Sequence, residues 1–298
     1  MTQMPQPGPP DESAHPYPQS WPGDPRETAP IPPYPYPVLP GAASYGPPNP
    51  FSPNPAAEPG SWTMLDLFSG LGLMLVASTV FALPFQLWDL SPTAALLLAG
   101  LAPIWLGILV QTRWSVRRRG SGSWRTDLGL RFRWVDLAIG LGVGIGARIA
   151  AGVVTLLTTD VDNPGRGNLD PIVGSLDGVA LALVMIFGVS IIGPVVEEIF
   201  FRGLLIRSAV DTIRRSRPSW SVPQVNRMSI GLSAVLFLAI HLPEFDDPRS
   251  LPAMIITIGG FGAACAALTV ATGRLGPAII SHIVFNGVSA VAVLSFLG

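Results

Sequence analysis

The strongest constraint on the fold is a series of long apolar runs that begins after Trp62 and continues to the end of the sequence. Of the 298 residues, 49% are hydrophobic and only 12% are charged. Soluble globular proteins carry about 25% charged residues. A helix needs ~20 apolar residues to cross the hydrocarbon core of a bilayer. We therefore expect an all-α protein of the cell membrane that crosses the bilayer several times.

Seven apolar runs alternate with short polar connections, and six of them are long enough to span a bilayer. The runs cover residues 64–85, 92–112, 135–157, 175–196, 228–241, 251–272 and 276–297. The run 228–241 is short, so it is either extended by residues 222–227 or broken. Residues 199–213 mix apolar and basic side chains, which predicts an extension of the fourth helix or an interfacial helix. The predicted fold is a polytopic transmembrane bundle of seven or eight helices.

The first 60 residues have a different composition from the rest of the chain. They hold 20 of the 32 prolines and all four tyrosines. Such a segment buries too little apolar surface to offset its ordering entropy, so we expect disorder with polyproline II character. A Pro-Tyr run such as 33–37 could dock into an aromatic groove of a partner, although a passive tail is the favoured interpretation. We therefore divide the chain into a Pro/Tyr-rich tail, 1–60, and a transmembrane domain, 61–298.

The distribution of arginine predicts the orientation of the chain in the membrane. Seven arginines lie within 113–133 and four within 214–227, whereas 158–174 carries three aspartates and one arginine. Cytoplasmic connections are enriched in basic residues. The two arginine-rich connections are therefore predicted to be cytoplasmic and 158–174 to be outside. The N-terminal tail is then expected to be cytoplasmic.

The third run carries glycines at every second position and one basic residue. Gly140, Gly142, Gly144 and Gly146 form two overlapping small-x-x-x-small patterns, which allow helices to approach closely. Arg148 follows at membrane depth. It is expected either to pair with an acidic group of the bundle or to lie near a cavity.

Three short patterns place ionisable and amide side chains in or beside the apolar runs. They are Glu197-Glu198-x-x-x-Arg202, Phe237-x-x-x-His241 and His282-x-x-x-Asn286. Ionisable groups at membrane depth cost roughly 2.5–3.5 kcal/mol each, so they are rare there and commonly mark function. Residues four apart share a helix face, so Glu198 is expected to pair with Arg202. Glu197 is offset by about 100° and is expected to face a neighbouring helix.

These residue types suit the hydrolysis of a peptide bond. The reaction needs an activated water, a group that stabilises the oxyanion and a proton donor for the leaving amine. Glu197 can act as the general base, His241 can orient the water or carry the proton, and His282 and Asn286 can donate to the oxyanion. In an alternative scheme, Glu197, His241 and His282 hold a catalytic divalent metal such as zinc and leave a fourth position for water. The residues alone leave both schemes open.

Taken together, Glu197-Glu198-Ile-Phe-Phe-Arg202-Gly203, Phe237-x-x-x-His241 and His282-x-x-x-Asn286 resemble the three motifs of the CPBP family. That family groups type 2 CAAX prenyl endopeptidases with bacteriocin-processing and immunity relatives. The resemblance extends over residues 120–298 and includes the stretch Asp127-Leu-Gly-Leu130. It implies an intramembrane endopeptidase, commonly classed as a metalloprotease, that acts on a membrane-bound protein or peptide. It also implies a site made of Glu197, His241, His282 and Asn286, with Glu198 and Arg202 in support.

Two functions of other classes compete with the protease interpretation. A non-enzymatic membrane scaffold or self-immunity protein would recruit partners through the tail, but it would not need Glu197 and both histidines. A proton-coupled transporter could use intramembrane Glu and His as a relay, but the spans show no inverted repeat. The sequence contains no glycine-rich phosphate loop and no patch suited to nucleic acid.

The predicted depths of the site residues do not agree at first sight. Glu197 and His282 fall toward the cytoplasmic half, whereas His241 lies ~20 Å into its span along a straight helix. Either the fifth span is misplaced, or residues 199–213 enter the bilayer and the whole site is central. The second explanation is favoured.

Overall fold

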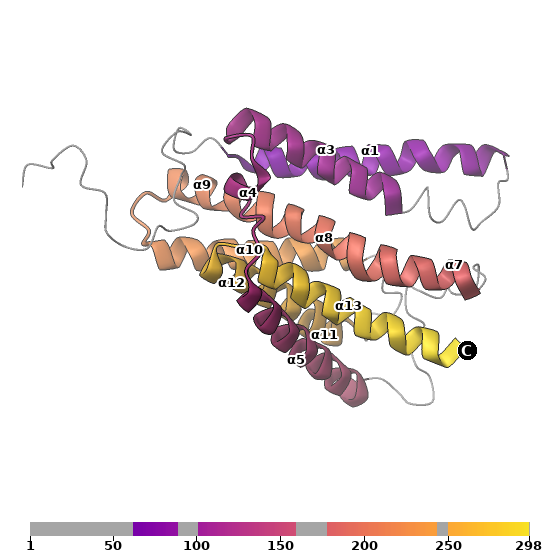
Figure 1. The fold of residues 1–298 in the computed structure, drawn as a ribbon. Helices are drawn as coiled ribbons and strands as arrows, with labels where there is room; N and C mark the ends of the chain where they lie inside the picture. The colour runs from indigo at the N-terminus through magenta and orange to yellow at the C-terminus, as the bar shows by residue number, and fades with distance from the viewer. Residues whose placement is uncertain (1–61, 89–100, 159–177, 243–249, 298) are drawn as a thin grey trace, which may run out of the picture. The chain divides into compact units, whose positions relative to one another are not determined.

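The computed structural model of the protein describes residues 62–88, 101–158, 178–242 and 250–297 (Figure 1). Within these ranges every regular element is a helix, and the helices form eight runs. The predicted all-α bundle of seven or eight helices is confirmed. The tail 1–60, its boundary with the transmembrane domain, residues 159–174 of the predicted outer connection and the first residues, 175–177, of the predicted fourth span lie outside the described residues.

The helical runs follow one another along the chain as follows. They are α1 (Met64–Trp88), α3 (Ala102–Arg119), α4 (Trp124–Asp127), α5 (Trp134–Thr158), a run of α7 (Gly178–Leu183), η2 (Val184–Ile192), α8 (Gly193–Glu198), η3 (Ile199–Leu205) and α9 (Ile206–Ser216), then α10 (Val222–His241), a run of α11 (Leu251–Met254), η6 (Ile255–Gly259) and α12 (Gly260–Thr272), and α13 (Gly276–Leu297). The η segments are π-helical.

Six of these runs are long and apolar enough to cross a membrane. They cover Met64–Leu83, Trp134–Thr158, Gly178–Ser216, Val222–His241, Leu251–Thr272 and Gly276–Ser295. The chain is a multi-pass membrane protein, as its composition predicts.

The second predicted span differs from the structure. The described helix α3 begins at Ala102 and continues to Arg119, so the first arginines of the predicted connection 113–133 are helical. Arginine is a good helix former, and basic residues in the last turn interact favourably with the helix dipole. The Arg119 guanidinium also pairs with the Asp66 carboxylate of α1 at 2.8 Å. Residues 92–100 of the predicted span lie outside the described residues.

The fourth and fifth spans are longer than the apolar pattern alone indicates. Residues 199–213 continue the fourth helix, which runs without a break from Gly178 to Ser216. The fifth helix begins at Val222 and not at residue 228. The side chain of Gln224 accepts a hydrogen bond from the Ser221 N–H at 2.8 Å, so polar residues cap this end. Of the two predicted alternatives for this span, extension by residues 222–227 is therefore confirmed and a broken helix is not.

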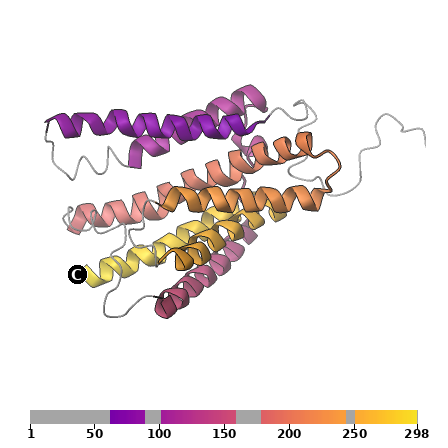
Figure 2. The ribbon, with the colours of Figure 1, turned by 180° about the vertical axis from the view of Figure 1, so that it is seen from behind.

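The η3 segment occupies the middle of the bundle. All seven of its residues are buried, and it contacts α1, α3, α10 and α12. A helix that is hydrophobic on every side belongs in a core. The salmon-coloured run that contains η3 is flanked by α1 and α3 on one side and by α10 and α12 on the other (Figures 1 and 2). The motif that begins with Glu197 is therefore placed at the centre of the fold.

Wide π-helical turns lie before this central segment because Pro194 interrupts the series of backbone hydrogen bonds of the helix. Pro194 has no N–H to donate, and its ring would clash with the carbonyl four residues earlier. Gly188 lies within this π-helical stretch and Gly193 follows it, and the Gly193 N–H bonds to the Gly188 carbonyl five residues back. Such π-turns occur frequently at functional sites.

Close packing of α5 against α13 depends on two of the four glycines in the small-x-x-x-small patterns. A Cβ at Gly140 would lie 2.5 Å from Ile280, and one at Gly144 would lie 2.6 Å from the Ser281 carbonyl. Gly142 and Gly146 have no atom within 4 Å of a built Cβ. The small-residue pattern is thus a packing device on one face of α5.

The start of α13 is fixed by backbone contacts to the segment between α4 and α5. The Leu275 N–H donates to the Gly129 carbonyl at 2.8 Å. Gly129 and Gly273 both have positive φ, and a side chain on Gly129 would meet the Gly273 carbonyl. Arg274 also donates from Nε to both oxygens of the Asp136 carboxylate, which raises the pKa of the guanidinium.

Candidate functional site

Glu198 and Arg202 form a fully buried ion pair, as their spacing predicts. Arg202 Nη1 lies 3.1 Å from Glu198 Oε1, and both side chains are 0% exposed. Removing two charges from water costs several kcal/mol each, so such a pair persists only with further partners. Arg202 Nη2 donates to the Gly262 carbonyl at 3.0 Å, and its guanidinium lies 4.3 Å from the centre of the Phe237 ring. The pair therefore ties the central helix to α12 and α10.

His282 is held between both glutamates. Its Nδ1 donates to Glu198 Oε1 at 2.8 Å, and its Nε2 lies 3.8 Å from Glu197 Oε2. The ring also makes edge contacts with Phe237 and Phe261, at centroid distances of 5.8 and 5.2 Å. These contacts fix the plane of the imidazole. The Glu198 hydrogen bond fixes the tautomer, so Nε2 is the ring nitrogen directed at Glu197.

Glu197 differs from its neighbour in exposure and in partners. Its side chain is 24% exposed, whereas that of Glu198 is fully buried. Among the described residues, the His282 imidazole lies 3.8 Å from the Glu197 carboxylate. The prediction that the two glutamates face different surroundings is confirmed by these contacts. Glu197 is therefore the less buried of the two carboxylates.

His241 lies at the C-terminal end of α10, beside the same aromatic ring that touches His282. Its ring centroid is 4.5 Å from that of Phe237, and its Nδ1 donates to the Phe237 carbonyl at 2.7 Å. That hydrogen bond leaves Nε2 as the available nitrogen. Phe237 is 1% exposed, and its buried ring contacts both the His241 and the His282 imidazole.

Asn286 lies one turn beyond His282 on α13, and its carboxamide donates a hydrogen bond to a backbone carbonyl of η2. Its Nδ2 donates to the Val189 carbonyl at 3.0 Å. The residue five positions after Val189 is Pro194, which has no N–H, and the Gly193 N–H is directed to Gly188. The carboxamide therefore supplies the donor that the backbone lacks. One of its two N–H groups is left for another acceptor.

The structure thus brings together Glu197, Glu198, Arg202 and His282, with His241 and Asn286 beside them. Sequence reasoning missed Phe261, which orients the imidazole, and Gly262, whose carbonyl accepts from Arg202. A Cβ at Gly262 would lie 2.9 Å from the Phe237 ring. No local motif marks either residue, because both act through contacts between distant helices.

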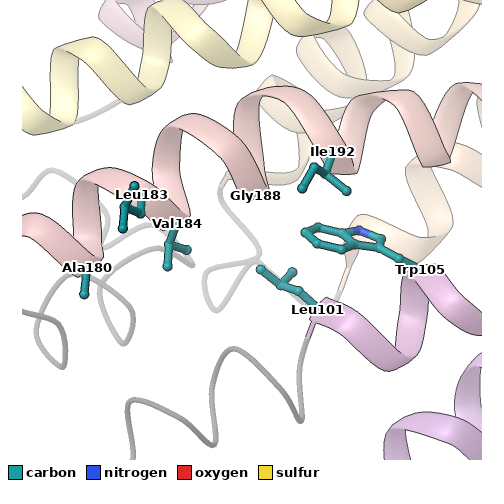
Figure 3. Close-up of a pocket in the computed structure, with 7 residues that line it drawn as sticks. All are labelled: Leu101, Trp105, Ala180, Leu183, Val184, Gly188 and Ile192. Atoms are coloured by element: carbon teal, nitrogen blue, oxygen red, sulfur yellow. The ribbon is translucent and has the colours of Figure 1, made fainter.

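An apolar pocket of about 290 Å³ adjoins the site. It lies between the start of α3 and the α7–η2 segment and is lined by Leu101, Trp105, Ala180, Leu183, Val184, Gly188 and Ile192 (Figure 3). A Cβ at Gly193 would lie 3.7 Å from Trp105 and 3.8 Å from Glu197 Oε1. The Trp105 ring, which lines the pocket, and the Glu197 carboxylate therefore both lie within 4 Å of the same point at Gly193.

The placement of the Glu197, His241 and His282 side chains decides whether the three-ligand metal scheme fits. Across the described ranges, no group of three or more His, Cys, Asp or Glu side chains is placed to hold a metal ion. Glu197, His241 and His282 as arranged here do not fit that scheme. Participation of a metal stays a prediction, and no step proposed below depends on one.

A family comparison identifies the segment that carries these residues. Residues 179–288 match the model of the type II CAAX prenyl endopeptidases, Rce1-like. This segment is an Rce1-like domain. The assignment to the CPBP family from the three motifs is confirmed, and the Rce1-like domain contains all six predicted site residues. The family match supports intramembrane endopeptidase activity of the CAAX type. No curated protein and no solved structure matches the chain.

Proposed function

We propose that the protein is an intramembrane endopeptidase in which Glu197 activates the attacking water. The observation that carries this proposal is the unequal pair of glutamates around one imidazole. Glu198 is buried and holds His282 Nδ1, whereas Glu197 is partly exposed and faces Nε2. A general base must be accessible to water, and an orienting carboxylate need not be. The two adjacent glutamates thus take different roles.

The reaction can be written with the residues of this chain alone. Water gives a proton to Glu197, and its oxygen attacks the carbonyl carbon of the substrate. The resulting oxyanion accepts a hydrogen bond from the second N–H of Asn286, and a second bond from His282 Nε2 would require a proton there in addition to the Nδ1 proton held by Glu198. When the C–N bond breaks, the leaving amine takes the proton from Glu197. His241, through Nε2, orients the water or carries that proton.

The apolar pocket suggests where a membrane-bound substrate is held. Its lining offers no charged group, and the Trp105 ring places it next to Glu197. The matching family is described as type II CAAX prenyl endopeptidases. We propose that the pocket takes up an apolar part of the substrate, such as a lipid chain, while the peptide bond lies at Glu197.

The direct test compares the termini of membrane proteins in cells that express the wild type or the Glu197→Ala variant at equal abundance. New termini that are present with the wild type and absent with the variant would establish proteolysis and name the substrates. Arg125→Gln serves as a matched control, because Arg125 is exposed and lies outside the site. Identical termini with the wild type and Glu197→Ala would overturn the protease proposal and favour the tail-mediated scaffold.

A further inference from the structure

The exposed charged side chains of the described residues are all arginines, and they gather at one end of the bundle. Five lie between residues 117 and 133, and three lie between residues 215 and 227. These stretches run from the end of α3 to the start of α5 and from the end of α9 into α10, and both views show them at the same end (Figures 1 and 2). Basic residues at the end of a membrane-spanning helix attract the headgroups of anionic lipids.

The two carboxylates in the stretch from α3 to α5 are bonded to the interior of the protein. Asp136 is 0% exposed and accepts hydrogen bonds from the Arg274 side chain and the Arg133 N–H. Asp127 is 4% exposed and accepts from the N–H and the hydroxyl of Ser121, at 3.0 and 2.8 Å. The exposed surface of this stretch therefore carries cations alone.

The segment of residues 131–134 combines two of these arginines with two aromatic rings. Arg131, Phe132, Arg133 and Trp134 are all exposed, and Trp134 is 85% exposed. The rings of Phe132 and Trp134 contact each other edge to face at a centroid distance of 5.9 Å. Aromatic residues at the ends of membrane-spanning helices lie at the level of the lipid headgroups. The two arginines are thus placed where lipid phosphates lie.

Hydrogen bonds hold this segment in place. The Arg131 N–H donates to the Gly129 carbonyl at 2.7 Å, and Arg131 Nε donates to the Arg125 carbonyl at 3.0 Å. The Arg133 N–H donates to Asp136 Oδ2 at 2.8 Å. The Cα atoms of the two arginines are two residues apart and therefore no more than ~7 Å apart. Their planar guanidinium groups can therefore bind one phosphate together.

The apolar surface of α5 that follows this segment selects among phosphate-containing ligands. Val135, Leu137 and Leu141 are 50%, 43% and 40% exposed. They begin a helix that is long and apolar enough to cross a membrane. A soluble phosphate would leave these side chains uncovered, whereas a phospholipid joins a phosphate to acyl chains that cover them. The combination of arginines, rings and an apolar helix surface favours a lipid.

We propose that residues 131–134 bind an anionic glycerophospholipid of the surrounding bilayer. Arg131 and Arg133 bind its phosphate, and the rings of Phe132 and Trp134 lie beside its glycerol and the upper part of its acyl chains. Binding requires a headgroup with net negative charge, because the site presents two cations. The interaction is non-covalent and does not depend on the proposed proteolysis.

Native mass spectrometry of the full chain in detergent measures this interaction directly. The probes are dioleoyl phosphatidylglycerol and dioleoyl phosphatidylcholine, which have the same acyl chains and differ in the net charge of the headgroup. The titration gives Kd for the first lipid bound. One arginine near an anionic headgroup strengthens binding about fivefold, so two should favour phosphatidylglycerol roughly 25-fold. Equal Kd values for the two lipids would overturn the inference.

Paired substitutions locate the site. Arg131→Gln/Arg133→Gln should weaken phosphatidylglycerol binding roughly 25-fold. Its unchanged affinity for phosphatidylcholine would show that the variant is folded. Arg117→Gln/Arg227→Gln removes the same charge from exposed residues of α3 and α10, so it is the matched control and should keep the preference. Equal losses in the two double variants would indicate a diffuse surface charge and overturn the inference.

A competition experiment distinguishes a lipid from a soluble phosphate. Inorganic phosphate is added to the complex with phosphatidylglycerol, and sodium chloride at the same ionic strength is the control. We expect both salts to have the same effect, because the acyl chains contribute to binding. Specific displacement by inorganic phosphate would overturn the assignment to a lipid.

Discussion

The hydrogen bond from Asn286 to the Val189 carbonyl allows a quantitative test of how the central helix is built. Replacing Asn286 with Ala removes the donor at 3.0 Å and leaves the carbonyl without a partner. Leaving a buried polar group unsatisfied costs about 1–3 kcal/mol. Water cannot replace the amide easily between membrane-spanning helices. We therefore expect Asn286→Ala to lower the free energy of unfolding by about 1–3 kcal/mol.

A second substitution should restore the missing donor from the backbone itself. Pro194 lies five residues after Val189, at the position from which a π-helical N–H would reach that carbonyl. Pro194→Ala introduces this N–H. The double variant should therefore be more stable than the sum of the single effects predicts, with a coupling energy of about 1–2 kcal/mol. Proteolytic activity should not return, because the Asn286 amide is still absent.

Thermal unfolding of the wild type, both single variants and the double variant in detergent micelles measures this coupling. In a domain of this size, 1 kcal/mol changes the Tm by about 2–4 °C. Asn286→Ala alone should lower the Tm by about 2–12 °C on that scale. Additive effects of the two substitutions, or an Asn286→Ala protein as stable as the wild type, would refute the assignment of the carbonyl's partner.

Three further predictions follow from the buried contacts. Arg202→Met leaves a buried carboxylate without its cation and should destabilise the protein by about 3–5 kcal/mol in thermal or denaturant unfolding; wild-type stability would contradict the buried pair. Gly144→Leu should abolish the folded protein in size-exclusion chromatography, because its Cβ would lie 2.6 Å from the Ser281 carbonyl. Gly142→Leu, with open space around its Cβ, is the matched control, and equal behaviour of the two would argue against the α5–α13 packing. Phe237→Leu removes the ring between the two imidazoles and should lower kcat at least tenfold with little change in KM in a peptide cleavage assay, whereas unchanged kcat would show that the ring has no positioning role.

Much of the fold can be predicted from the sequence because the bilayer imposes the length and polarity of each span. The helix spacing likewise predicts the Glu198–Arg202 pair and the different surroundings of Glu197. The apolar signal of α10 begins after Val222, so the sequence leaves open whether this helix is extended by residues 222–227 or broken, and the structure shows the extension. The cap formed by Ser221 and Gln224 is the local signal that could have placed it.

The parts of the site that could not be predicted depend on contacts between helices far apart in the chain. The role of Phe261 becomes visible only when α12 and α13 are placed together. The bond between Asn286 and the Val189 carbonyl depends on a π-helical turn that no simple periodicity indicates. The sequence leaves open whether Arg148 pairs with an acidic group or lies near a cavity, and the contact found in the described part of the chain is the Phe285 ring of α13.

The bonds from Leu275 to Gly129 and from Arg274 to Asp136 hold the start of α13 in place, so a tilt of this helix would be centred there. His282 lies only ~9 Å along the axis from Gly276, whereas Leu297 lies ~31 Å away. A rotation of about 10° at the pivot would displace the imidazole by ~1.6 Å and the far end by ~5.5 Å on these lengths. A tilt of α13 about its anchored start would therefore move the His282 imidazole less than one third as far as the far end of the helix.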